Sequence, residues 1–206
     1  MGLFSFNKAP EIRDENIVQE WSQLVLQMGN KGEELLKRIA AKIQELNLPL
    51  VTLMREEATL GSSHNRYNFV SVKHEKYPDY KVWIGAIDRM GQLKVSWFLV
   101  VKLPNIITAK MRALNQASRG GKERVLRPSQ RFGRMLGAKL TEKMTGKPVP
   151  VRVRPDELTM DDKEEYGVFV SLIHQATTSS LEEIMNDLNL DFSKVDTHTE
   201  GFLNLS

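Results

Sequence analysis

The sequence LKVSWFLVV, residues 93–101, decides the fold, because its side chains alternate in character with a period of two. The odd-numbered positions are all apolar, whereas the other face begins with the polar residues Lys94 and Ser96. Such alternation is typical of a β-strand, in which successive side chains point to opposite faces of a sheet. Phe98 and Val100 add apolar side chains to the second face, so we expect this strand to lie at the centre of the sheet.

Three further stretches rich in Val, Ile and aromatic residues precede this strand, at residues 50–54, 67–72 and 80–87. Residues 88–92, with the sequence DRMGQ, form a short glycine-containing link of the kind found in β-hairpins. The sequence therefore predicts an antiparallel meander of three or four strands.

A helical pattern covers residues 14–46, where apolar side chains recur at spacings of three and four. The residues of this stripe are Ile17, Trp21, Leu24, Met28, Leu35, Ile39, Ile43 and Leu46. The turn residues Gly29 to Gly32 interrupt the stripe, but the gap of seven from Met28 to Leu35 keeps it in phase. One long helix weakened at its middle is therefore favoured over two helices, and we expect it to pack on the meander.

The chain after the meander is expected to be mainly helical. Residues 104–148 contain short apolar stripes with helical spacing. Further on, either Ser179 with Glu182 or Ser180 with Glu183 can form a capping box, which predicts that a helix begins there.

The predicted fold class is α+β. A long N-terminal amphipathic helix packed on an antiparallel β-meander occupies residues 1–102. A basic helical segment follows in residues 103–155, and an acidic C-terminal segment follows in residues 156–206. We expect one compact domain with a loose tail, because residues 191–206 show no period.

The composition excludes several classes of site. The chain has 206 residues and no cysteine, so a disulfide scaffold, a Cys-ligated zinc or iron–sulfur site and a thiol nucleophile are ruled out. Hydrophobic residues make up 41% and charged residues 27%, which indicates a globular protein and not a disordered one. No apolar run approaches the roughly 20 residues of a membrane span, so we expect a cytoplasmic protein with no membrane partner.

The formal net charge of +3 hides an uneven distribution of charge along the chain. Residues 1–101 hold 13 basic and 12 acidic residues. The next part, residues 102–154, is called the basic segment here, and it holds 14 basic and two acidic residues. The last part, residues 155–206, is called the acidic segment, and it holds two basic and 12 acidic residues. Asymmetry of this size points to a charged partner.

Three physical accounts of this asymmetry stay open. In the first, the basic segment binds nucleic-acid phosphates, and the acidic segment can compete for the same surface. In the second, the two segments neutralise each other within the fold, and in the third they pair between neighbouring subunits. The candidate phosphate-binding residues are Lys110, Arg112, Arg119, Lys122, Arg124, Arg127, Arg131, Arg134 and Lys139. Six of these nine are arginine, whose planar guanidinium group suits phosphate.

The first account leads to the expected function, a non-enzymatic nucleic-acid-binding protein that grips the phosphate backbone. The alternative is a structural or adaptor subunit of a protein assembly. In that alternative, basic and acidic surfaces pair between copies, by self-association, or with a protein partner.

No catalytic, metal-binding or cofactor-binding constellation accompanies the charge pattern. The four histidines lack the helical spacing of a zinc site; we expect His64 to be solvated in a loop and His174 to lie at the edge of the core. Pro78-Asp79 followed by Lys94 is like a scattered metal-nuclease signature. A hairpin would, however, separate Asp79 from Lys94 by roughly 23 Å. We therefore expect no enzyme activity, no metal and no cofactor.

The strand region also contains the aromatic residues Tyr67, Phe69, Trp83, Trp97 and Phe98. On an exposed sheet face these rings could stack unpaired bases, but a place in the hydrophobic core is the favoured interpretation. Trp83 and Trp97 lie on the two arms of one hairpin and can form a cross-strand pair.

Overall fold

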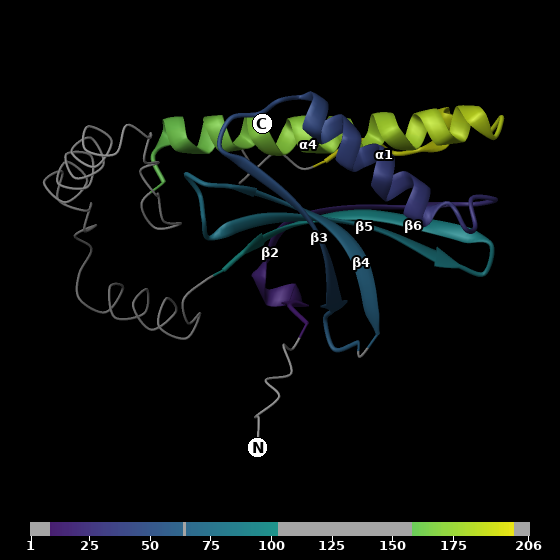
Figure 1. Ribbon diagram of the computed structural model, residues 1–206, viewed down its shortest axis with the longest axis horizontal. Helices are drawn as coiled ribbons and strands as arrows, with labels where there is room; N and C mark the ends of the chain where they lie inside the picture. Colours follow the sequence, from purple (N-terminus) through teal and green to yellow (C-terminus); the bar gives the residue numbers. More distant parts are fainter. Residues whose placement is uncertain (1–8, 64, 103–157, 200–206) are drawn as a thin grey trace, which may run out of the picture.

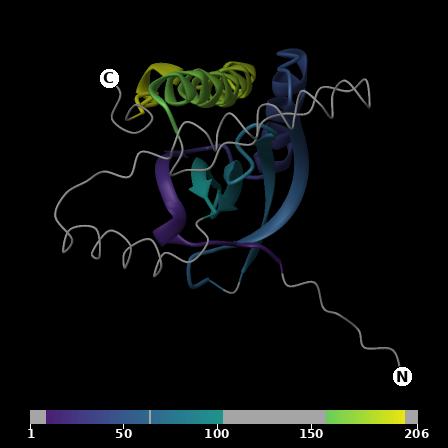
Figure 2. The ribbon, with the colours of Figure 1, turned by 90° about the vertical axis from the view of Figure 1, so that its left-hand side faces the viewer.

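The computed structural model describes residues 9–63, 65–102 and 158–199. These residues form one six-stranded sheet with two helices over one of its faces (Figure 1). Seen from the side, the sheet curves into a half-barrel (Figure 2). Within the described residues, no helix is both long enough and apolar enough to cross a membrane.

The sheet has the strand order β1-β3-β4-β5-β6-β2. Strands β3 to β6 run antiparallel in chain order, β2 adds antiparallel to β6, and β1 pairs parallel with β3. The strands are β1 (Glu11–Ile12), β2 (Ile17–Val25), β3 (Val51–Leu60), β4 (Arg66–His74), β5 (Tyr80–Arg89) and β6 (Gln92–Val101). The strand predicted to be central, β6, lies between β5 and β2.

The link between the two edge strands explains the curvature of the sheet. Strands β1 and β2 lie at opposite edges, yet Ile12 and Ile17 are joined only by Arg13 and the 3-10 turn η1 (Asp14–Asn16). Five residue steps span at most about 17 Å, whereas six flat strands would separate the edges by about 24 Å. The sheet must therefore curl until its edges come within reach of this link.

The predicted long N-terminal helix over residues 14–46 is wrong. Residues 17–25 form β2, and only Gly32–Glu45 form a helix, α1. A spacing of four, as between Trp21 and Val25, places two side chains on one face of a strand as well as on one face of a helix. The pattern in this stretch therefore did not distinguish the two structures. The fold is a mixed half-barrel in which the long helix comes late in the chain.

A tight turn between β2 and α1 is what prevents a continuous helix. Gln27 and Asn30 have positive φ angles of 61° and 65°, which lie in the left-handed region and end regular structure. The Gly29 amide donates a 3.0 Å hydrogen bond to the Gly91 carbonyl in the β5–β6 turn. A Cβ atom on Gly29 would lie 2.7 Å from Gly91 Cα, so only glycine allows this approach.

The late helix is α4 (Met160–Asp187), which is continuous over 28 residues. It begins with a capping box in which Asp162 N donates to Thr159 Oγ1 and Thr159 N donates to Asp162 Oδ2. The predicted helix start at Ser179 or Ser180 is wrong, because both residues lie inside α4. Ser180 Oγ instead donates a 2.7 Å hydrogen bond to the Ala176 carbonyl, one turn earlier in the helix.

The turn between β4 and β5 holds both ends of the described chain that flank the basic segment. Lys102 N, just after β6, donates a 2.6 Å hydrogen bond to the Asp79 carbonyl. Lys76 Nζ lies 3.3 Å from Asp162 Oδ1 in the first turn of α4 and also pairs with Glu165. The chain therefore leaves the core after β6 and returns to it at α4 beside the same turn.

The hydrophobic core has two parts, one on each face of the sheet. The larger part joins α1, α4 and one sheet face, and its fully buried residues include Trp97, Tyr77, Tyr166, Leu35 and Ile39. The smaller part lies on the opposite face and comprises Ile12, Ala58, Phe69, Trp83 and Phe98.

Gly85 in β5 provides a test of packing on the second face. It pairs with Phe69 in β4, and a Cβ atom on Gly85 would lie 2.6 Å from Phe69 Cε1. Phe69 is only 1% exposed, so its ring cannot move aside freely. We expect Gly85→Ala to lower the free energy of unfolding by about 1–3 kcal/mol in urea denaturation.

The double variant Gly85→Ala with Phe69→Leu tests the cause of that loss. Because the shorter side chain removes the close approach, the double variant should lose less stability than the sum of the two single variants. Losses that add to within about 0.5 kcal/mol would show that the two residues do not interact.

Candidate functional site

The nine predicted phosphate-binding residues, Lys110, Arg112, Arg119, Lys122, Arg124, Arg127, Arg131, Arg134 and Lys139, lie outside the described residues. The structure therefore does not place them, and the site built below comes from the described residues.

The aromatic residues of the sheet are core residues and not an open stacking platform. Trp97 and Phe69 are each 1% exposed, Trp83 is 5% exposed and Phe98 is 7% exposed. Trp83 pairs with Phe98 across the hairpin, whereas Trp97 pairs with Ile84, so the two tryptophans point to opposite faces. The predicted Trp83–Trp97 cross-strand pair is therefore wrong.

The nuclease-like pattern and a metal site both fail on geometry. Ile87 pairs with Lys94 at one end of the β5–β6 hairpin, and Asp79 precedes β5 at the other end. The predicted separation of Asp79 and Lys94 is thus confirmed. Among the described residues, no group of three or more His, Asp or Glu side chains is placed to hold a metal ion.

The most specific polar cluster in the described chain surrounds His174 of α4. Trp97 Nε1 donates a 2.8 Å hydrogen bond to His174 Nδ1, and His174 Nε2 lies 2.8 Å from the Thr197 carbonyl oxygen. An indole N–H can only donate and a carbonyl oxygen can only accept. The imidazole must therefore be neutral, with its proton on Nε2.

Trp21 of β2 adds a second anchor beside this histidine. Its Nε1 donates a 2.7 Å hydrogen bond to the Asp196 carbonyl, and its ring meets the His174 ring edge-on at 5.4 Å. Trp21 pairs with Trp97 in the β2–β6 ladder, which explains why both tryptophans reach the same histidine. We call His174, Trp97 and Trp21 the histidine clamp.

The clamp holds residues 191–199, which we call the C-terminal strap. The sequence shows no period here, yet Phe192 and Val195 pack against the main core, and a 3-10 turn, η3 (Phe192–Lys194), begins the strap. Asp191 accepts a 3.0 Å hydrogen bond from Ser193 N, and Asp196 Oδ1 accepts a 2.9 Å bond from His198 N. The strap is thus held along its length by the core and by its own turns.

Hydrogen bonds within the strap also keep its carboxylates charged. The hydroxyl and the amide of Ser193 lower the pKa of Asp191, and the amide of His198 lowers the pKa of Asp196. Both carboxylates therefore stay ionised to lower pH than ordinary aspartates.

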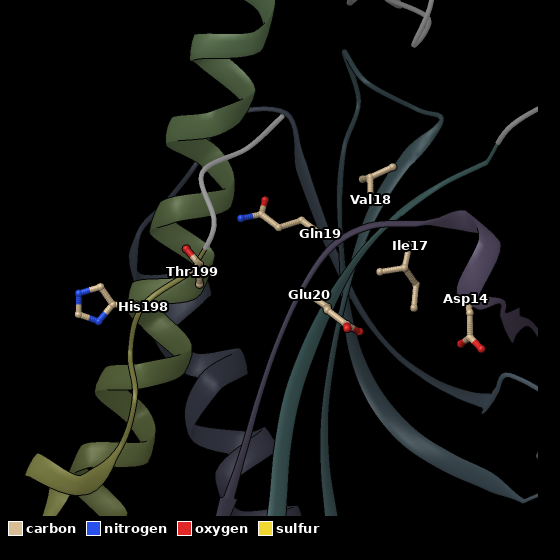
Figure 3. A pocket seen from close by; sticks show the side chains of 7 residues that line it. All are labelled: Asp14, Ile17, Val18, Gln19, Glu20, His198 and Thr199. Atoms are coloured by element: carbon tan, nitrogen blue, oxygen red, sulfur yellow. The ribbon is translucent and has the colours of Figure 1, made fainter. Parts of the chain in front are cut away.

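The strap forms one wall of a hollow of about 620 Å³ against η1 and β2 (Figure 3). Figure 3 shows Gln19 extending from β2 toward Thr199, with Glu20 and Asp14 further along the opposite wall. The lining residues are Asp14, Ile17, Val18, Gln19, Glu20, His198 and Thr199. A β-bulge between Ile17 and Gln19 turns Val18 out of the ladder at this place.

The charge of the hollow disfavours phosphate. Asp14 and Glu20 are the carboxylates of its lining, and the lining contains no lysine or arginine. Like charges repel, so an anionic ligand would be destabilised there, whereas a cationic group would be attracted.

A second polar cluster lies at the start of α4 and is structural. Tyr77 is fully buried, and its hydroxyl donates a 3.0 Å hydrogen bond to Glu165 Oε2. Burial raises the pKa of Tyr77 to about 12, and Lys76 lies 5.1 Å from its ring centre. A neutral phenol packed in this way anchors α4 to the β4–β5 turn.

Comparisons with known proteins assign no class to the chain. It matches no protein-family model, and neither the curated proteins nor the solved structures contain a significant match.

Sequence reasoning found part of this site. It placed His174 at the edge of the core, where the structure has it half-buried. It missed the clamp, because Trp97 is 77 positions from His174 and Asp196 is 175 positions from Trp21. No local spacing connects residues so far apart, and the spacing around Trp21 predicts a helix instead of a strand.

Removal of one N–H donor tests how the strap is held. We expect Trp21→Phe to weaken attachment of the strap by about 1 kcal/mol, because it removes the hydrogen bond to Asp196. Hydrogen exchange of the strap amides should then become about fivefold faster.

Trp83→Phe is the matched control, since Trp83 lies on the opposite face of the sheet, in the smaller part of the core. It removes the same atoms without touching the strap. Equal acceleration of exchange in the two variants would mean that general loosening, and not the Asp196 bond, controls the strap.

Proposed function

We propose that this chain is a non-enzymatic nucleic-acid-binding protein that grips phosphate through the basic segment, residues 102–154. The observation that carries the proposal is the separation of charge between the basic segment and the rest of the chain. A cytoplasmic location belongs to the same proposal.

The described residues have the wrong sign of charge to attract a polyanion by themselves. They contain 15 Lys and Arg against 21 Asp and Glu, a net charge of −6. A nucleic acid would therefore be repelled by this part of the protein and attracted only by the basic segment. Affinity should fall steeply as salt increases, because counterions are released from the phosphates on binding.

Several acidic side chains of α4 already have basic partners in the core. Arg38 Nη2 lies 2.8 Å from Asp187 Oδ2, and Lys42 Nζ lies 2.6 Å from Glu183 Oε1. Lys76 pairs with Asp162 and Glu165 as described above. These ion pairs reduce the acidic charge that is left to neutralise the basic segment within the fold, which favours an external partner.

The second candidate function is a structural or adaptor subunit. The same charge separation favours it, because a core of net charge −6 in one copy complements the basic segment of another. It differs from the first candidate in requiring no nucleic acid and in predicting oligomers that dissociate with salt.

Charge reversal distinguishes the two candidates. We expect Arg124, Arg127, Arg131 and Arg134, all changed to Glu, to abolish retention of single- and double-stranded nucleic acid. Smaller subsets of these changes should reduce the slope of log K against log salt by about 0.9 for every phosphate that is no longer bound on duplex DNA. The measurement is binding over a salt series, with the molar mass read by light scattering on the same samples.

The control reverses four exposed basic residues of the described core, Arg13, Lys37, Arg66 and Lys194, and so makes the same change in net charge. It should bind nearly as the unchanged chain does. Equal loss in both quadruple variants would show a general effect of net charge. Unchanged retention with salt-sensitive oligomers would favour the subunit function instead.

Competition from the acidic segment is tested on α4. Asp161, Glu164 and Glu182 are exposed and, within the described chain, have no ion-pair partner. If they compete with phosphate for the basic segment, changing them to Asn, Gln and Gln should raise nucleic-acid affinity at low salt, with the gain vanishing at high salt.

The matched control for that experiment changes Glu45, Glu57 and Glu75 to Gln. These three carboxylates are exposed and lie away from α4 in the sequence. If both triple variants gain affinity equally, the α4 carboxylates have no special role.

A further inference from the structure

We propose that the histidine clamp is a pH-sensitive latch, and that protonation of His174 releases the C-terminal strap from β2 and opens the neighbouring hollow. This inference goes beyond the proposed function and does not rest on it. It follows from the hydrogen-bond polarity of one imidazole ring.

The ring position satisfies two partners of opposite polarity. His174 Nδ1 accepts from Trp97 Nε1 at 2.8 Å, and His174 Nε2 donates to the Thr197 carbonyl at 2.8 Å. A second proton would sit on Nδ1 and face the indole N–H, so two donors would point at each other. Trp97 cannot move away, because it is 1% exposed and lies in an inner strand.

The imidazole ring must therefore move when it is protonated. Because one ring position serves both nitrogens, a movement away from Trp97 also takes Nε2 from the Thr197 carbonyl. The same movement takes the ring out of its edge-on packing against Trp21, where the ring centres are 5.4 Å apart. The strap would keep only the Trp21–Asp196 hydrogen bond and its apolar packing at this end.

Other groups near the clamp do not replace this change of charge. Within one turn of His174, α4 carries no charged residue. Glu20 follows Gln19 on β2, Lys94 precedes Trp97 by three residues on β6, and Asp196 and His198 flank Thr197 in the strap. The pKa of Asp196 is lowered by the amide of His198, so this carboxylate stays charged while a histidine titrates.

The direction of the pH dependence follows from burial. Burial lowers the pKa of His174, and the hydrogen bond to Thr197 opposes this in part. The released strap therefore binds a proton more tightly than the held strap. Attachment is complete above the pKa of free histidine, about 6.5, and weakens as the pH falls below it toward the lowered pKa. Between these two values the ratio of held to released strap changes by about tenfold per pH unit.

Release of the strap changes the hollow as well. His198 and Thr199 form its wall on the strap side, and they follow Thr197 directly in the chain. When Thr197 detaches, this wall loses its nearest anchor. The acid form of the protein would then expose Asp14, Gln19 and Glu20 of the opposite wall.

The test is hydrogen exchange of the full chain at pH 7.5 and at pH 5.0, corrected for intrinsic exchange rates and read on peptides from the strap and from α1. In the unchanged chain, we expect strap protection to fall about tenfold per pH unit below the pKa of free histidine, while α1 stays protected. In His174→Gln it should not change with pH, because an amide offers one acceptor and one donor without titrating. His198→Gln removes a second histidine, an exposed one, and should behave as the unchanged chain.

Four results would each overturn the latch. They are equal strap protection at both pH values, an equal fall in strap and α1, the same fall in His174→Gln, and loss of the pH response in His198→Gln. If His174→Gln does not fold, the imidazole of the unchanged chain is titrated by NMR. The midpoint of strap release must then match the titration of His174, and a mismatch would also overturn the proposal.

Discussion

The short link between β1 and β2 is the constraint on which the rest of the structure depends. Arg13 and η1 are all that joins two strands at opposite edges of a six-stranded sheet. Because so few residues cannot span a flat sheet, the sheet curls, and Ile12 and Ile17 at the ends of the link pack with the second-face cluster. The curl also sets β2 beside β6 in a register that places Trp21 opposite Trp97. The gathering of both indoles at His174 follows from this register.

The sequence located the strands better than it located the helices, for a physical reason. The hairpin of β5 and β6 was readable because a period of two over ten residues fits no helix. In residues 17–25 the apolar side chains lie four apart, a spacing common to both structures, and the turn at Gln27 and Asn30 decided the outcome. The start of α4 at Thr159 was missed, because a threonine–aspartate box resembles loop sequence until its tertiary partner Lys76 is known.

The candidate site shows where reasoning from sequence ends. Charge can be counted along a chain, so the opposed basic and acidic segments were visible without coordinates. Contacts between distant positions cannot be counted in this way, and the clamp consists only of such contacts. The ion pairs of α4 with Arg38, Lys42 and Lys76 add a partition that the sequence did not show. Part of the acidic charge binds the core together, and the rest faces solvent.

The attachment of the basic segment at the β4–β5 turn has a consequence for how the chain can vary. Asp79 receives the chain as it leaves β6, and Lys76 receives it again at α4. The core thus fixes both ends of the intervening residues beside one another. The entropy of closing such a loop depends only weakly on its length, so that even a doubling costs about 0.6 kcal/mol. The intervening residues can therefore lengthen, shorten or change in sequence while the half-barrel and its helices keep their register.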